Sequence, residues 1–156
     1  MNKLYVKVLV CVAVCLGLGT ASGFSTASSI NGWYQTIQKP SWNPPNWIFG
    51  PVWTVLYILM GIAAALVWHS RSADKKIALA LFAFQFVLNL LWTYIFFGMH
   101  NLQLALIEIM LLSVSIAITL YWFLKVNKTA AVLLLPYLMW VSFASSLTYT
   151  IFIMNS

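Results

Sequence analysis

The sequence of 156 residues contains very little charge. Charged side chains make up 6% of it, and only Asp74 and Glu108 are acidic. A soluble domain has about a quarter of its residues charged, whereas here apolar types make up 63% and the mean hydropathy is +0.93. This composition excludes a soluble domain and predicts an integral membrane protein. No basic cluster is larger than Arg71, Lys75 and Lys76, so we expect no nucleic-acid partner.

Motifs that carry chemistry are also missing. The sequence has no HExxH or CxxC motif, no phosphate-binding glycine loop and no plausible Ser/His/Asp set. Cys11 and Cys15 are better interpreted as small apolar fillers than as a metal or redox pair, because two thiols do not complete a site. We therefore expect no metal and no cofactor, and the sequence argues against an orthodox hydrolase, transferase or pump.

Long apolar runs take the place of these features. We expect five membrane-spanning helices, over about residues 4–26, 48–68, 77–97, 102–124 and 130–154. About 20 apolar residues cross the hydrocarbon core, and backbone amides in lipid must pair within a helix. Short links make sequential neighbours antiparallel. The predicted fold is an all-α membrane protein: one domain over 1–156, a five-transmembrane-helix bundle with a long first loop rich in proline and tryptophan.

The first apolar run has two interpretations. Its basic start, apolar middle and small-residue end also describe a signal peptide. We favour a retained helix, because Gly19 and Gly23 have the GxxxG spacing that permits close helix packing. Cleavage of residues 1–22 would leave the orientation of the other spans unchanged.

Lysine and arginine are distributed unevenly between the two sides of the predicted bundle. The amino terminus and the links 69–76 and 125–128 share one side and carry seven of the eight basic residues, and the other side carries only Lys39. Basic loops are enriched on the cytoplasmic side. We expect a bacterial plasma-membrane protein with a cytoplasmic amino terminus and an extracytoplasmic first loop.

The stretch from Trp33 to Tyr57 concentrates aromatic residues and prolines. It holds four of the eight tryptophans and four of the five prolines. Proline fixes φ and removes a backbone donor, so the first part is expected to be a stiff connector, with a helix beginning near Trp47. A solvated loop would leave several indole side chains in water, which is unfavourable for such large apolar groups. We therefore expect the connector to fold as a lid at the membrane interface.

Three predicted spans each contribute a large indole, from Trp53, Trp92 and Trp140. On the third span, Gln85 and Asn89 share the face of Trp92. An amide in the membrane is costly unless it bonds across helices, so this face points inward. For both amides, a structural role in hydrogen bonding between helices and a role in ligand binding are equally open. An aromatic stripe is more often core, but convergent indoles beside amides suit a flat, apolar, aromatic ligand.

Glu108 is the one carboxylate inside a predicted span. An ionisable residue at this depth is a functional hypothesis by default. Because it lies near the outer end of the fourth span, where it can reach interfacial water, a structural role is equally open.

Three motifs resemble a known family. The first loop and second span read WYQTIQKPSWNPPNWIFGPVWTVLYILMG, the third span reads QFVLNLLWTYIFF, and the fifth reads LLLPYLMWVSFASSLTY. They resemble the tryptophan-rich sensory protein family (TspO/MBR), which includes the mitochondrial translocator protein, or peripheral benzodiazepine receptor. The resemblance covers nearly the whole chain and is weakest in the first and fourth spans.

The resemblance implies a membrane-embedded sensory or translocator-type protein, often a homodimer, that binds porphyrins beneath the first loop. The ligand-binding residues that it implies are Tyr34, Pro44, Trp53, Tyr57, Asn89, Trp92, Trp140 and Ala144. In some bacterial members, light-dependent porphyrin degradation is attributed to tryptophans matching Trp53 and Trp140, so a catalytic role for this pair is an alternative. Transport of an apolar ligand and a purely structural or regulatory role are further alternatives.

Two departures from the family pattern bear on the ligand. Leu147, Thr148 and Tyr149 stand where the family usually has LNY, so a hydroxyl replaces an amide. No lysine or arginine follows Tyr149, so the proposed cholesterol motif is missing. We expect porphyrin binding rather than sterol binding.

Overall fold

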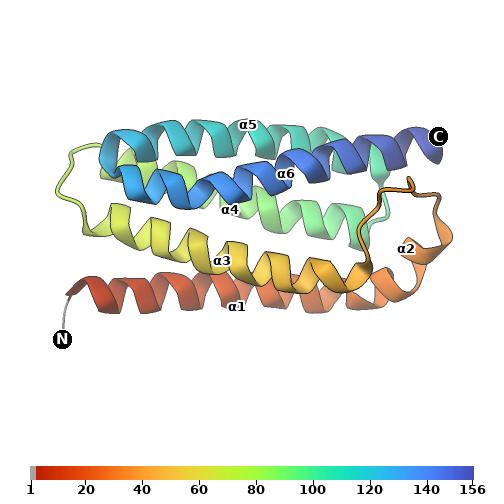
Figure 1. The fold of residues 1–156 in the computed structure, drawn as a ribbon, viewed down its shortest axis with the longest axis horizontal. Helices are drawn as coiled ribbons and strands as arrows, with labels where there is room; N and C mark the ends of the chain where they lie inside the picture. The colour runs from red at the N-terminus through yellow and green to blue at the C-terminus, as the bar shows by residue number, and fades with distance from the viewer. Residues whose placement is uncertain (1–2) are drawn as a thin grey trace.

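The computed structural model describes residues 3–156, which form a bundle of long helices lying side by side (Figure 1). The long helices are α1 (Lys3–Asn31), α3 (Asn46–His69), α4 (Lys75–Thr93), α5 (Leu102–Val126) and α6 (Lys128–Met154). A π-helical turn, η1 (Tyr94–Gly98), continues α4, and a single turn, α2 (Trp33–Thr36), lies between α1 and α3.

Five segments of the described chain are long and apolar enough to cross a membrane. They lie in α1, α3, α4 continued by η1, α5 and α6. The predicted fold class, an all-α bundle of five transmembrane helices with a long first loop, is confirmed. The chain is a multi-pass integral membrane protein.

Helix α1 is longer than the predicted 4–26, because it continues through a run of serines and threonines to Asn31. Hydroxyl side chains in this run bond carbonyls of their own helix. The Thr20 hydroxyl donates to the Leu16 carbonyl at 2.6 Å, and the Thr26 hydroxyl donates to the Gly23 carbonyl at 2.9 Å. Bonds of this kind hide a polar group within the helix, so the run is compatible with an apolar environment.

Helices α1 and α3 pack directly on each other, and α5 packs between α4 and α6. Two glycines allow the close approach of α1 and α3. A Cβ at Gly19 would overlap the Tyr57 ring, and a Cβ at Gly61 would overlap the backbone of Val12. At Gly23, the other half of the GxxxG spacing, a Cβ would meet nothing within 4 Å. The tight contact therefore lies toward the amino-terminal half of α1.

The connector between α1 and α3, residues 32–45, is called the lid below. It lies at the end of the bundle that also holds the carboxyl terminus (Figure 1). Asn155 ties it to the end of α6 by a pair of bonds to Gln38. The Gln38 N–H donates to Asn155 Oδ1 at 3.0 Å, and Asn155 Nδ2 donates to the Gln38 carbonyl at 2.9 Å. The lid is thus anchored to the helix that ends the chain.

Candidate functional site

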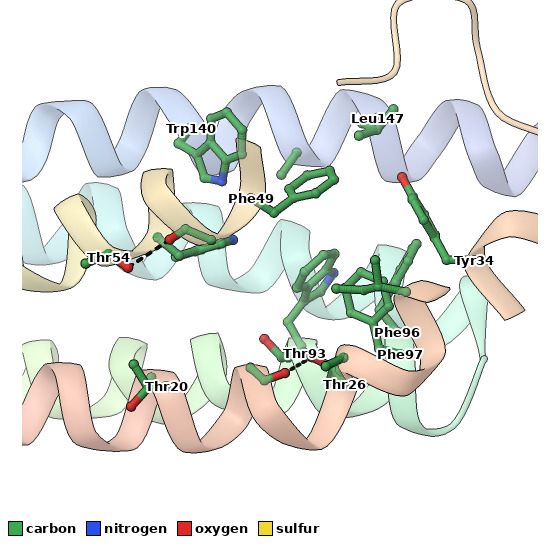
Figure 2. Close-up of a pocket in the computed structure, with 18 of the residues that line it drawn as sticks. Thr20, Thr26, Tyr34, Phe49, Thr54, Thr93, Phe96, Phe97, Trp140 and Leu147 are labelled. Carbon is green, nitrogen blue, oxygen red and sulfur yellow. Dashed lines mark hydrogen bonds between the residues drawn. The ribbon is translucent and has the colours of Figure 1, made fainter. Parts of the chain in front are cut away.

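A cavity of about 350 Å³ lies beneath the lid, between α1, α3, α6 and the junction of α4 with η1 (Figure 2). Figure 2 shows Trp140 of α6 and Phe49 of α3 on one side, with Thr20 and Thr26 of α1 on the other. Tyr34 of the lid closes one end of the cavity. No described residue of α5 lines it.

Six of the eight predicted ligand-binding residues line this cavity: Tyr34, Trp53, Tyr57, Trp92, Trp140 and Ala144. Pro44 and Asn89 are not among the described wall residues. Pro44 lies half-buried in the lid, where its carbonyl accepts a bond from Asn43 Nδ2 at 3.0 Å. Asn89 is buried behind the wall at 1% exposure. Neither is therefore in direct contact with the cavity as its described wall defines it.

Each of the three indoles is half-buried and is held in place by another aromatic ring. Trp53 stacks on Tyr57 with centroids 5.5 Å apart, and Trp92 stacks on Phe96 at 5.1 Å. Trp140 meets the ring of Phe49 edge-on at 6.2 Å and an interplanar angle of 71°. Such ring pairs add to the packing energy and restrict rotation. The cavity therefore presents fixed aromatic surfaces from three helices.

The two buried amides of α4 each accept a hydrogen bond from a tyrosine of another helix. The Tyr57 hydroxyl donates to Asn89 Oδ1 at 3.0 Å, which joins α3 to α4. The Tyr137 hydroxyl donates to Gln85 Oε1 at 2.8 Å, which joins α6 to α4. Asn89 thus reaches the cavity indirectly, because it fixes the ring of Tyr57.

Tyr34 is the lid residue that is buried most deeply, at 2% exposure. Its hydroxyl donates to Asn43 Oδ1 at 2.7 Å. Burial raises the pKa of this phenol to about 12, so its hydroxyl is neutral at physiological pH. Lys39 Nζ donates to the carbonyls of Tyr34 and Ile37, at 2.5 and 3.0 Å, and so braces the same turn.

The described cavity wall carries no Asp, Glu, His, Lys or Arg. Residues 3–156 also contain no group of three or more His, Cys, Asp or Glu that could hold a metal ion. Glu108 lies apart from the wall, is 7% exposed, and has no hydrogen-bond partner for either carboxylate oxygen among the described residues. The cavity is therefore neutral and aromatic, which suits an uncharged or apolar ligand surface.

Sequence reasoning missed the contribution of α1 to this wall. Thr20, Gly23 and Ala27 follow one another at helical spacing and line the cavity. We interpreted the spacing of Gly19 and Gly23 as a helix-packing motif and assigned no role to Thr20 and Ala27. Phe49 and Phe143, which complete the aromatic wall, carried no signal that set them apart from other apolar residues of their spans.

A model of the TspO/MBR family matches residues 11–154. The chain belongs to the TspO/MBR family. It is 43% identical to the tryptophan-rich protein TspO of Chlorobaculum tepidum over 99% of each chain. It is 38% identical to the tryptophan-rich protein TspO of Archaeoglobus fulgidus, over 96% of this chain and 97% of that one. The translocator protein of Homo sapiens is 38% identical over 90% of this chain and 84% of that protein.

The predicted membership of the TspO/MBR family is thereby confirmed, including the relation to proteins named translocator protein. The matched region begins at Cys11, so it contains every described wall residue of α1 as well as the lid and the walls from α3, α4 and α6. The cavity therefore belongs to the part of this TspO/MBR chain that the family shares.

Proposed function

We propose that this TspO/MBR protein binds a tetrapyrrole, such as a porphyrin, in the cavity beneath the lid. The observation that carries the proposal is the convergence of three ring-braced indoles from three helices on one neutral aromatic cavity. Its volume of about 350 Å³ falls within the roughly 300–1,000 Å³ of small-molecule sites. A flat aromatic macrocycle can stack on these surfaces and leave its polar edge toward the lid.

The wall residues contribute to the proposed binding in different ways, according to their positions. Trp53 and Trp140 offer stacking surfaces from α3 and α6, and Trp92 offers one from the end of α4. Tyr57, which bonds Asn89, stacks on the ring of Trp53 and also lines the cavity. Ala144 leaves space on α6 where a larger side chain would fill the cavity.

The test is a titration of the purified protein in detergent with protoporphyrin IX, monitored by the porphyrin Soret band. Loss of one aromatic contact removes about 0.5–1.5 kcal/mol beyond area burial. The double variant Trp53→Ala, Trp140→Ala should therefore raise Kd about 5- to 160-fold. The control is Trp47→Ala, because Trp47 is 74% exposed and is not a described wall residue. An unchanged Kd in the double variant would remove the proposed site.

A second candidate is light-dependent porphyrin degradation in this cavity, with Trp53 and Trp140 as the residues in contact with the photo-excited macrocycle. It is favoured by one observation: both indoles line the same cavity. Illumination of the complex separates the candidates. A Soret band that bleaches no faster than that of free porphyrin restricts the protein to binding.

We also propose that the lid faces the extracytoplasmic side of a bacterial plasma membrane. The basic residues of α1 and of the links before α4 and α6 gather at the end opposite the lid, and Lys39 is the basic residue of the lid itself. This is the distribution of a protein whose lid lies outside. Labelling of a cysteine introduced at exposed Ser41 by an impermeant reagent in intact cells tests it, and protection from the reagent would contradict it.

A further inference from the structure

The cavity wall is exposed on one side. The described wall residues that are exposed lie on α1 and α3: Thr20, Gly23, Phe24, Ala27, Gly50 and Thr54. The wall residues from the lid, α4, η1 and α6 are buried or half-buried. Phe24 is 83% exposed although it lies in the membrane-spanning part of α1, so it contacts lipid. The cavity therefore reaches the surface of the bundle at the seam between α1 and α3.

The glycines along this seam differ in what a Cβ at their position would meet. Toward the amino terminus of α1, Gly19 and Gly61 allow contacts so close that a Cβ would overlap the opposite helix. Toward the lid, a Cβ at Gly23 of α1 or Gly50 of α3 would meet nothing within 4 Å. Gly50 and Thr54 are four and eight residues into α3, about 6 and 12 Å along its axis. The open positions at Gly23 and Gly50 thus lie at the depth of the lid-side leaflet.

The two described threonines at the edges of the seam present no free hydroxyl to a ligand. The Thr20 hydroxyl donates to the Leu16 carbonyl at 2.6 Å, and the Thr54 hydroxyl donates to the Gly50 carbonyl at 2.8 Å. Each threonine therefore satisfies its hydroxyl within its own helix and leaves its methyl group available for apolar contact. An apolar molecule can pass these edges without breaking a hydrogen bond.

The lid, in contrast, is fastened on several sides. Two bonds join Gln38 to Asn155 of α6, and a further bond joins Tyr34 to Asn43 within the lid. Trp33 stacks on His100 of the α4–α5 link with centroids 4.3 Å apart. A path through the lid would require several of these contacts to break, whereas the seam between α1 and α3 has none at Gly23 and Gly50.

We propose that this seam is a lateral portal: a flat apolar aromatic ligand dissolved in the lid-side leaflet enters and leaves the cavity between α1 and α3. The proposal rests on the binding function proposed above and adds the source and route of the ligand. It predicts that an obstruction in the seam slows the entry and the exit of the ligand.

The experiment measures association and dissociation of protoporphyrin IX by stopped flow, with the protein in phosphatidylcholine nanodiscs. Gly23→Leu and Gly50→Leu place a side chain in the portal from its two edges, each at a position where a Cβ meets no atom. We expect each to slow both association and dissociation, by about tenfold for dissociation, because the leucine obstructs the portal. Gly17→Leu is the matched control, because Gly17 is also exposed, open and on α1, but is not a described wall residue.

Asn155→Ala tests the alternative route through the lid, because it removes both bonds between Gln38 of the lid and Asn155 at the end of α6. The portal predicts native rates for this variant. Faster association in Asn155→Ala, with native rates in Gly23→Leu and Gly50→Leu, would place the route through the lid and overturn the proposal. Faster dissociation from the glycine variants would show that leucine fills the binding site instead of the portal, and would also contradict the proposed portal. An unchanged Kd in the Trp53→Ala, Trp140→Ala variant would show that the proposed binding function itself is wrong, which separates that failure from a failure of the portal.

Discussion

Replacement of Tyr57 by phenylalanine separates the structural role of the α3–α4 hydrogen bond from the aromatic role of the ring. The change deletes one oxygen atom. It leaves Asn89 Oδ1, in a side chain that is 1% exposed, without the bond that it accepts at 3.0 Å. The phenyl ring is retained, and with it the stack on Trp53 at 5.5 Å. Stability should therefore fall while ligand affinity stays close to native.

The magnitude follows from the environment of the bond. In soluble proteins an unsatisfied buried acceptor costs about 1–3 kcal/mol. Interhelical hydrogen bonds in membranes contribute less, on average about 0.6 kcal/mol and at most about 1.7, because the reference state also finds partners. Both partners here are buried, Tyr57 at 5% and Asn89 at 1% exposure. We expect a loss near the upper end, about 1–1.7 kcal/mol of unfolding free energy.

The assay is a double-mutant cycle with Tyr57→Phe, Asn89→Leu and the double variant, unfolded by denaturing detergent in mixed micelles. The coupling energy should be close to the loss in the single tyrosine variant, because the pair is joined directly. Tyr137→Phe deletes the equivalent bond to Gln85 at 2.8 Å and provides a comparison at a tyrosine that is not a described wall residue. Additive effects of Tyr57→Phe and Asn89→Leu would refute the argument that this bond couples α3 to α4.

Three further changes test other parts of the structure. Gly61→Ala should destabilise the protein by about 1–3 kcal/mol, because the new Cβ would overlap the Val12 backbone. Gly17→Ala is the control and should not destabilise it, because a Cβ there meets nothing within 4 Å. Equal thermal midpoints of the two variants would contradict this account of the packing. Glu108→Leu should stabilise by about 1–3 kcal/mol in the same unfolding assay, because both carboxylate oxygens lack partners among the described residues; a loss of stability would reveal a structural role. Lys39→Met should speed amide exchange in the lid, because it removes two bonds to lid carbonyls; exchange at the native rate would show that the lid is held elsewhere.

The long helices could be predicted because their signal is local. Length and apolar composition alone decide whether a segment crosses a membrane. The end of α1 was predicted less well, since the run from Thr20 to Ser29 resembles the end of a signal peptide. Its helical state depends on hydroxyls that bond preceding carbonyls, as Thr26 does with Gly23. Such bonds follow from a helix already in place and are not evident from composition.

The site could be predicted in part for a related reason. Helical periodicity indicates which face of a span points inward, and it correctly grouped Asn89 with Trp92. It does not indicate which neighbouring side chain meets that face. Asn89 accepts the bond from Tyr57 and is not a described wall residue, whereas Trp92 lines the cavity. The position of Pro44 depended on the folding of the lid, which is fixed by tertiary contacts such as Asn155 with Gln38.

Helix α1 has the least distinctive sequence of the bundle, and the structure gives it two different tasks along its length. As far as Gly19 it packs closely on α3, because Gly19 leaves room for the ring of Tyr57 and Gly61 leaves room for the backbone of Val12. Beyond Gly19 it supplies part of the cavity wall, in which Gly23 and Ala27 are exposed. A small residue permits close approach in the first part and leaves an opening in the second. The same residue type therefore has opposite consequences, because at Gly19 the facing group is the ring of Tyr57 and at Gly23 there is none within 4 Å.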